Sequence, residues 1–372
     1  MRTAICVVGA RPNLMKIAPI VAALKAQGRF KVLIVHTGQH YDSRMSDSFF
    51  ADLGIPAPDV NLEVGSASHA VQTAEVMKRF EPVLDQAADP FVLVVGDVNS
   101  TLACALVAAK KGVPVAHVEA GLRSWDRAMP EEINRILTDQ LSDLLFTTER
   151  SALGNLVKEG IPEARVHFVG NVMIDTLRAN LGRAVPVAAT LAENGVSLPG
   201  PRHGVLTLHR PSNVDEPEVL ARLMGAARLV AAQCPLVFPV HPRTRSRIEQ
   251  AGLDRGLAEA GIVMIPPQGY LSMLGLMRDA QLVLTDSGGI QEETTALGVP
   301  CLTLRDNTER PITIDEGTNL LIGTDAEDIV AAARTILATG GKGGRIPEYW
   351  DGKAAERIAQ ILADTLGGSG AA

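Results

Sequence analysis

Short apolar runs alternate with periodic stretches through the first half of the chain. The runs lack the polar–apolar alternation of a half-exposed strand, so they predict parallel strands that are buried on both faces. The predicted strands are residues 4–8, 31–37, 91–95, 113–118 and 144–147. The predicted helices are residues 12–26, 41–53, 69–84, 100–110, 130–141 and 149–159. This rhythm predicts a doubly wound α/β sheet.

The rhythm breaks between residues 170 and 203, where one short helix (173–181) is followed by proline- and glycine-rich sequence. A second alternating set then begins. Its predicted strands are residues 204–208, 236–240, 262–265, 282–284, 301–304 and 319–322. The last two periodic stretches, 326–338 and 352–366, predict helices. We therefore expect two Rossmann-like domains, residues 1–170 and 171–351, facing a central cleft.

Composition narrows the class of protein. The 372 residues are 46% hydrophobic and carry a net charge of −7, which is typical of a globular protein and disfavours a nucleic-acid or anionic-membrane partner. The four cysteines are far apart, so we expect a reducing, cytoplasmic setting and neither a disulfide framework nor a metal cluster. No apolar run reaches the length of a membrane span. The start of the chain is interpreted as a first strand, not a signal peptide.

The stretch 282–300 predicts an anion site. A buried strand is followed by Asp286 and Ser287, then by Gly288 and Gly289 at the start of a helix predicted over 290–297. Two glycines at a helix N-terminus leave backbone N–H groups open to a diphosphate. Glu293, one turn later, suits a ribose diol. An ordinary capped strand–turn–helix is the alternative interpretation.

The next loop favours the anion site, because consecutive parallel strands end at the same crevice. It carries Arg310, which could meet a phosphate held by the glycine turn. His209 and Arg210 end the first strand of the second domain and point to the same crevice, although His209 could also be a helix cap. No G-x-G-x-x-G follows the first strand, so the sequence gives no support for a nicotinamide or flavin cofactor.

Strand ends of the first domain carry the candidate catalytic groups. Arg11 and Lys16 follow the first strand; they could contact one phosphate or form a solvated helix start. Asp97 follows the strand at 91–95 and could instead be a simple cap. Glu119 lies among small and apolar residues, which disfavours a purely solvated role. Glu131, beside Glu132, also suits a helix N-terminus electrostatically. Carboxylates and a histidine without metal-ligand spacing favour proton transfer.

Seven motifs carry a resemblance that covers essentially the whole chain. They are GARPNLMKIAP at 9–19, GDVNST at 96–101, HVEAGLR at 117–123, MPEEINR at 129–135, GNVMID at 170–175, TDSGGIQEE at 285–293 and RDNTERP at 305–311. In this order they resemble the non-hydrolysing UDP-N-acetylglucosamine 2-epimerases, which have the glycosyltransferase-B fold. The resemblance implies that a C-terminal helix, about 352–368, packs back on the first domain.

The resemblance also implies roles for individual residues. The family's catalytic acids fall on Asp97, Glu119 and Glu131, with His209 as the phosphate-side histidine. Its nucleotide contacts fall on Arg11, Lys16, Gln268, Ser287, Gly288, Gly289, Glu293 and Arg310. The family's uridine-side aromatic position falls on Met273, and Asn13 replaces a glutamate found in many bacterial members. Some members bind a second sugar nucleotide as an activator; Gln39, His40 and Arg210 match part of that site.

The activity implied is C2 epimerisation of UDP-N-acetylglucosamine to UDP-N-acetylmannosamine, through UDP elimination to 2-acetamidoglucal and re-addition. The expected setting is a homodimeric cytoplasmic enzyme without cofactor or metal that supplies surface polysaccharide synthesis. Four alternatives stay open. They are epimerisation of a related UDP-acetamido sugar, a hydrolysing epimerase, a retaining glycosyltransferase and a non-catalytic sugar-nucleotide sensor.

Overall fold

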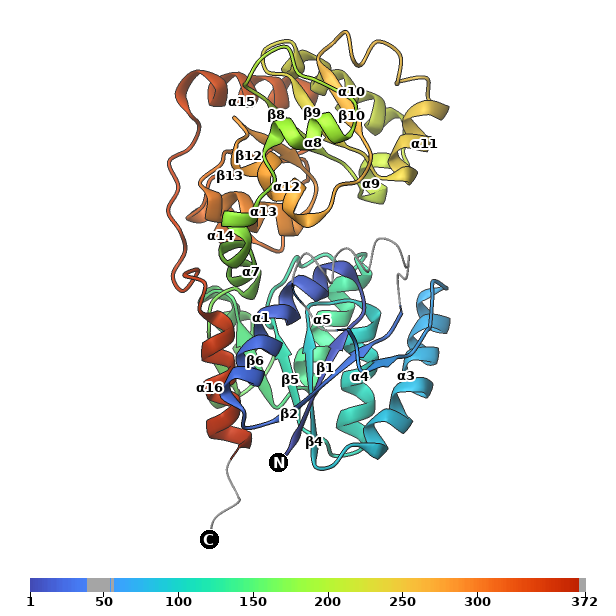
Figure 1. Ribbon diagram of the computed structural model, residues 1–372, viewed down its shortest axis with the longest axis vertical. Helices are drawn as coiled ribbons and strands as arrows, with labels where there is room; N and C mark the ends of the chain where they lie inside the picture. The colour runs from blue at the N-terminus through green and yellow to red at the C-terminus, as the bar shows by residue number, and fades with distance from the viewer. Residues whose placement is uncertain (39–53, 55–56, 368–372) are drawn as a thin grey trace. The chain divides into compact units, whose positions relative to one another are not determined.

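The computed structural model describes residues 1–38, 54 and 57–367, without the side chains of Arg11 and Pro12. It divides into two compact units (Figure 1). Unit 1 comprises Met1–Ala179 and Glu348–Ala372, and unit 2 comprises Asn180–Pro347. The helix predicted over 41–53 lies outside the described residues.

The described residues of unit 1 form a parallel sheet of seven strands in the order β3-β2-β1-β4-β5-β6-β7. The strands are β1 (Thr3–Val8), β2 (Lys31–His36), β3 (Val60–Asn61), β4 (Pro90–Val95), β5 (Val115–Val118), β6 (Leu144–Thr147) and β7 (Val166–Phe168). Alternate residues of β1 enter different core clusters, Ala4 and Cys6 one and Ile5 and Val7 the other. Both faces of the strand are therefore covered, which explains its unbroken apolar run.

Helices cover both faces of this sheet (Figure 1). One core cluster contains residues of α1 (Arg11–Gln27) and α16 (Ala354–Leu366), and the other contains residues of α3 (His69–Gln86) and α4 (Asn99–Lys110). The remaining helices of unit 1 are α5 (Pro130–Leu141), α6 (Ser151–Lys158), the 3₁₀ turn η1 (Glu163–Arg165) and α7 (Val172–Asn180), which ends at the unit boundary.

Unit 2 repeats the plan with six parallel strands in the order β10-β9-β8-β11-β12-β13. The strands are β8 (Gly204–Thr207), β9 (Leu236–Pro239), β10 (Ile262–Ile265), β11 (Val283–Thr285), β12 (Cys301–Thr303) and β13 (Asn319–Leu321). Its helices are η2 (Leu181–Arg183), α8 (Val187–Glu193), α9 (Pro211–Val214), α10 (Pro217–Ala231), α11 (Pro242–Gln250), α12 (Tyr270–Arg278), α13 (Gly288–Leu297), α14 (Pro311–Asp315) and α15 (Ala326–Thr339). The predicted α/β class with two Rossmann-like domains is confirmed.

Both strand orders place a switch in winding direction beside the first strand of the sheet. In unit 1 the chain winds outward on both sides of β1 and β4, and in unit 2 on both sides of β8 and β11. The loops that follow these strands diverge and leave room for a ligand at the carboxyl ends. The predicted Lys16, Asp97, His209 and Ser287 all follow switch-point strands.

The GNVMID motif (residues 170–175) contacts the segment in which the chain returns from unit 2 to unit 1. Gly170 has φ +90°, and a Cβ atom there would lie 2.0 Å from the carbonyl oxygen of Tyr349. Asp175 accepts hydrogen bonds from the N–H groups of Ala354 and Ala355 at 3.1 and 2.7 Å, at the start of α16. The unit boundary falls after Ala179, beyond the predicted residue 170, because α7 belongs to this contact.

Replacing Gly170 by Ala should destabilise unit 1 by roughly 3 kcal/mol, because the added methyl overlaps backbone and the positive φ disfavours a side chain. Gly154→Ala is the matched control. Gly154 lies in α6 with nothing within 4 Å of an added Cβ, so this change should stabilise the helix by about 1 kcal/mol. Thermal unfolding of both variants measures the difference. A Gly170→Ala melting temperature at or above that of the wild type would contradict the close approach.

Candidate active site

Asp97 lies at the carboxyl end of β4 and is held by α5. Arg135 Nη2 lies 2.8 Å from Asp97 Oδ2, and Asn134 Nδ2 donates to the Asp97 carbonyl oxygen at 2.9 Å. The Asp97 side chain is 26% exposed, so it is fixed on one side and open on the other. Such a carboxylate can exchange a proton with a bound molecule.

Glu119 follows β5 and is almost fully buried, with its side chain only 2% exposed. Its carboxylate lies 2.5 Å from Lys16 Nζ, and its backbone has φ +73°, a left-handed conformation that is costly for a glutamate. A Cβ atom at Gly96 would lie 3.1 Å from the same Lys16 ammonium. Lys16 thus connects Glu119 to the turn that carries Asp97.

The two glutamates of α5 have different surroundings. Glu132 is buried and accepts hydrogen bonds from Ser124 N, Ser124 Oγ and Trp125 N, each at 2.9 Å. Glu131 is exposed, and its carbonyl oxygen accepts a 3.3 Å bond from Arg135 Nε. Glu132 therefore holds a loop, whereas the Glu131 carboxylate is open to solvent. Arg135 contacts both the Asp97 carboxylate and the backbone carbonyl oxygen of Glu131.

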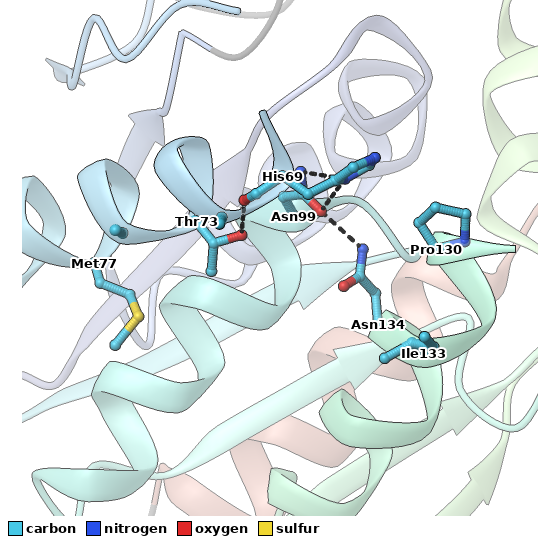
Figure 2. A pocket seen from close by; sticks show the side chains of 9 residues that line it. His69, Thr73, Met77, Asn99, Pro130, Ile133 and Asn134 are labelled. Carbon is cyan, nitrogen blue, oxygen red and sulfur yellow. Dashed lines mark hydrogen bonds between the residues drawn. The ribbon is translucent and has the colours of Figure 1, made fainter. Parts of the chain in front are cut away.

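A hollow of about 490 Å³ lies beside this cluster, between α3, α4 and α5. Figure 2 shows His69, Asn99 and Asn134 in a hydrogen-bonded row along it. The Asn99 amide is 3.1 Å from His69 Nδ1, and Asn134 Nδ2 donates to Asn99 Oδ1 at 3.2 Å. Because Asn134 also bonds Asp97, the polar edge of the hollow continues into the acidic cluster.

In unit 2 the predicted glycine turn begins α13. Ser287 is the N-cap position, and Gly288 and Gly289 are the first two helical residues. Glu309 also lies here: a Cβ atom at Gly288 would be 2.7 Å from its Oε1. Burial raises the pKa of Glu309, but the neighbouring Arg310, Arg305 and Arg210 outweigh burial and hold it well below its usual range. The glycine turn therefore lies close to several arginines and to the ionised carboxylate of Glu309.

His209 is held in one orientation by Asp286. Asp286 Oδ1 lies 2.7 Å from His209 Nδ1, and the N–H groups of His209 and Arg210 both donate to Asp286 Oδ2 at 3.0 Å. Burial raises the Asp286 pKa, yet His209 and these backbone donors bring it below its ordinary value. The His209 side chain is 53% exposed. Its Nε2 is therefore the nitrogen that can contact a ligand.

Glu293 is buried one turn into α13. Burial is the main cause that raises its pKa to about 7; a hydrogen bond with Tyr270 lowers the value and the nearby Glu292 raises it. Glu292 pairs with Arg310, whose Nε lies 2.8 Å from Glu292 Oε1. Arg310, at the start of α14, thus contacts α13 at the residue next to Glu293.

Of the other predicted nucleotide contacts, Gln268 lies between β10 and α12, and Met273 lies in α12. Gln268 Nε2 donates to the Pro266 carbonyl oxygen at 2.7 Å. Met273 packs against a core cluster of unit 2 and is only partly buried. The Arg11 side chain and residues Gln39 and His40 lie outside the described residues.

Asp286 and Arg135 were missed as functional candidates. The sequence identifies Asp286 and Ser287 only as residue types that favour an N-cap, and Ser287 occupies that position. Arg135 stands four residues after Glu131, the spacing of one helical turn, which was the available signal. Their partners, His209 and Asp97, are 77 and 38 residues away in sequence.

The described residues contain no group of three or more His, Cys, Asp or Glu side chains that could hold a metal ion. None of the helices there combines the length and apolarity that crossing a membrane requires.

Comparison with known proteins assigns the family. The sequence profile of the UDP-N-acetylglucosamine 2-epimerases matches residues 22–363. The UDP-N-acetylglucosamine 2-epimerase of Methanocaldococcus jannaschii is 42% identical over 359 residues, 96% of this chain and 97% of that protein. A UDP-2,3-diacetamido-2,3-dideoxy-D-glucuronate 2-epimerase of Pseudomonas aeruginosa is 42% identical over 361 residues, with 96% and 98% covered.

A solved structure gives the same assignment. The M. jannaschii UDP-GlcNAc 2-epimerase in complex with UDP-GlcNAc and UDP superposes with a TM-score of 0.88 at 41% identity, covering 98% of this chain and all of that one. The fold is accordingly the glycosyltransferase-B-like arrangement of two α/β domains. With a family profile spanning most of its length, this chain belongs to the UDP-N-acetylglucosamine 2-epimerase family.

Proposed function

We propose that this chain is a non-hydrolysing epimerase that interconverts UDP-N-acetylglucosamine and UDP-N-acetylmannosamine at C2. One observation carries the proposal. A cluster of carboxylates lies at the switch point of unit 1, and an arginine-flanked glycine turn with an oriented histidine lies at the switch point of unit 2. Proton transfer needs the first set of groups and a diphosphate leaving group needs the second.

The chemistry of the sugar requires elimination before inversion. The C2–H bond has no carbonyl beside it, so direct deprotonation is very costly. Breaking the C1–O bond places positive charge on the ring and makes the C2 proton removable. A carboxylate takes that proton, and 2-acetamidoglucal and UDP result. Re-addition of UDP, with a proton delivered to the opposite face of C2, gives the epimer and restores every atom.

Residues of unit 2 are suited to the leaving group. The N–H groups at Gly288 and Gly289, with Arg310 nearby, can stabilise the diphosphate as negative charge develops on it. In its charged form, with the Nδ1 hydrogen facing Asp286, His209 can donate the Nε2 hydrogen to the departing oxygen, and Asp286 stabilises that charged form before the transfer. Ser287 and Glu293 complete the proposed nucleotide site, and Gln268 and Met273 are assigned to the uridine side.

Residues of unit 1 are suited to the two faces of C2. Inversion needs one group to remove the proton and another to deliver it, and Asp97, Glu119 and Glu131 supply three candidates in one neighbourhood. Lys16 and Arg11 are assigned to the diphosphate.

The exact acetamido sugar needs a direct test, because one relative is named for a diacetamido-glucuronate substrate. Incubation with UDP-N-acetylglucosamine should give UDP-N-acetylmannosamine by NMR without accumulation of free UDP. Release of UDP with free sugar would favour the hydrolysing alternative.

We also propose a cytoplasmic homodimer that supplies polysaccharide synthesis, with Gln39, His40 and Arg210 as a candidate activator site. Light scattering and activation by added UDP-N-acetylglucosamine test these assignments.

UDP binding should become tighter as the pH rises through about 7, because the ribose hydroxyls donate to the ionised form of Glu293, whose pKa is raised to about 7. Each pH unit below that value should weaken this contribution by up to about tenfold. Calorimetry at pH 6.5 should also detect proton release when UDP binds. The UDP phosphate itself titrates in this range, so Glu293→Gln is the control that isolates the glutamate. Identical pH slopes and proton release for both proteins would contradict the assignment.

A further inference from the structure

His117 on β5 is completely buried and contacts two acceptor groups. Its Nδ1 lies 2.7 Å from Asp139 Oδ1, on α5, and its Nε2 lies 2.9 Å from the carbonyl oxygen of Gly96. A carbonyl oxygen can only accept a hydrogen bond. A neutral imidazole has one N–H group, so it can satisfy only one of two acceptors.

The donors that face Asp139 indicate that the second hydrogen lies on the His117 ring rather than on Asp139. Asp139 Oδ2 already faces two donors, the N–H of Gly121 at 3.1 Å and Arg123 Nη2 at 2.7 Å. These donors favour an ionised carboxylate. With Asp139 ionised, hydrogen bonds at both ring nitrogens require an imidazolium.

The surrounding charges offset the desolvation cost of a buried imidazolium. Arg123 also pairs with Glu159 at 2.5 Å, so the chain of groups alternates in sign from His117 through Asp139 and Arg123 to Glu159. The four charges sum to zero, which limits the desolvation cost that an isolated buried ion would carry. Two further ion pairs lie by the Gly96 turn, Lys16 with Glu119 and Arg135 with Asp97, and each is neutral overall.

This imidazolium holds the peptide that precedes Asp97. The Gly96 N–H donates to the Val118 carbonyl oxygen at 3.1 Å, and the Gly96 carbonyl accepts from His117. Both ends of the glycine are therefore fixed to β5, in a backbone conformation with φ +67°. A neutral ring that kept its hydrogen on Nδ1 would present a lone pair to the carbonyl oxygen and repel it.

We infer that both ring nitrogens of His117 carry hydrogen and that this imidazolium is a positioning residue for Asp97, acting through Gly96. The positioning role rests on the proposed function, in which Asp97 exchanges a proton with the sugar. The protonation state does not, because it follows from hydrogen-bond partners alone. The two parts can therefore be tested separately.

NMR of the wild-type protein with ¹⁵N-labelled histidine tests the protonation state. At the pH of the activity assay, both His117 nitrogens should show directly bonded protons and imidazolium shifts. His203 is an internal control in the same spectrum. It is equally buried, but its Nε2 bonds only the Leu276 carbonyl oxygen, at 2.9 Å, and Nδ1 has no partner among the described residues. His203 should therefore show one protonated nitrogen. A single protonated nitrogen at His117 would overturn the inference whatever reaction the protein catalyses.

His117→Gln tests the positioning role, because a carboxamide offers one donor group and turns an oxygen toward the other acceptor. We expect kcat to fall roughly 10²-fold through misplacement of Asp97. KM for the sugar nucleotide and the calorimetric affinity for UDP should stay within about twofold, because neither ligand is bound by His117. A variant with wild-type kcat, or one that loses kcat and UDP affinity together, would contradict positioning. Should the variant fail to fold, the wild-type spectrum still decides the protonation state.

Discussion

Product formed in D2O should carry deuterium at C2. In the proposed mechanism, the proton removed by one carboxylate exchanges with solvent before the opposite face is reprotonated, so the incoming hydrogen comes from the bulk. Mass spectrometry or proton NMR of UDP-N-acetylmannosamine would measure the incorporation. Epimerised product that keeps protium at C2, formed at the full rate in D2O, would overturn the elimination mechanism.

The same assay assigns the carboxylates. Asp97→Asn, Glu119→Gln and Glu131→Gln should each slow deuterium incorporation by about 10²–10⁴-fold, the usual contribution of a general acid or base. Glu356→Gln, on the exposed face of α16, is the control for loss of one negative charge and should exchange at the wild-type rate.

Glu132→Gln gives a stability contrast. It should lower the melting temperature more than Glu131→Gln does, because Glu132 holds the Ser124–Trp125 backbone.

Replacing Asp286 by Asn should lower kcat by roughly 10²–10⁴-fold, although Asp286 does not contact substrate in the proposed mechanism. The carboxylate fixes the His209 ring and stabilises its charged form. Asn can do neither reliably, because its amide can turn an N–H group toward the ring. His209→Asn should show a comparable loss, and the double variant should be little worse than either single variant, since the two residues act as a unit.

Stability must be separated from catalysis in this experiment. The folded-state pKa of Asp286 lies below its ordinary value, so its carboxylate stabilises unit 2 above the unfolded pKa, and that contribution is lost as the pH falls. Rates should therefore be measured well below the melting temperature of each variant. Asp215→Asn, which removes the partner of Arg243 and Arg247 near the same loop, should leave kcat unchanged. Additive losses in the double variant would show that His209 and Asp286 act independently.

The sequence predicted the fold well because its strands are buried on both faces. In the run at residues 4–8, for example, every residue is apolar, so the run lacks the polar positions of an amphipathic helix. The strands that were missed, β3 and β7, are the two edges of their sheet and are only two and three residues long. Helix α7 follows the predicted domain boundary yet belongs to unit 1, where it contacts α16. The sequence does not indicate this contact, because the two helices are nearly 180 residues apart.

The candidate site divides in the same way. Residues that directly follow strands, such as Asp97 and His209, could be predicted because parallel strands align their carboxyl ends. Residues that act through these groups could not. Asp286 orients His209, and Arg135 holds Asp97, only through contacts that join distant parts of the chain. Position along the sequence alone does not indicate such contacts.

The return of the chain to unit 1 has a consequence for synthesis on the ribosome. Unit 2 is continuous in sequence and is complete once Pro347 has emerged. Unit 1 begins before unit 2 but also needs α16, because Ala354, Ile358 and Leu362 of α16 enter the same core cluster as Leu14, Ile17 and Leu24 of α1. Figure 1 shows α16 beside α1. Throughout translation of unit 2, the apolar surface of α1 lacks this cover. The nascent chain therefore exposes this apolar surface of α1 until α16 has been synthesised.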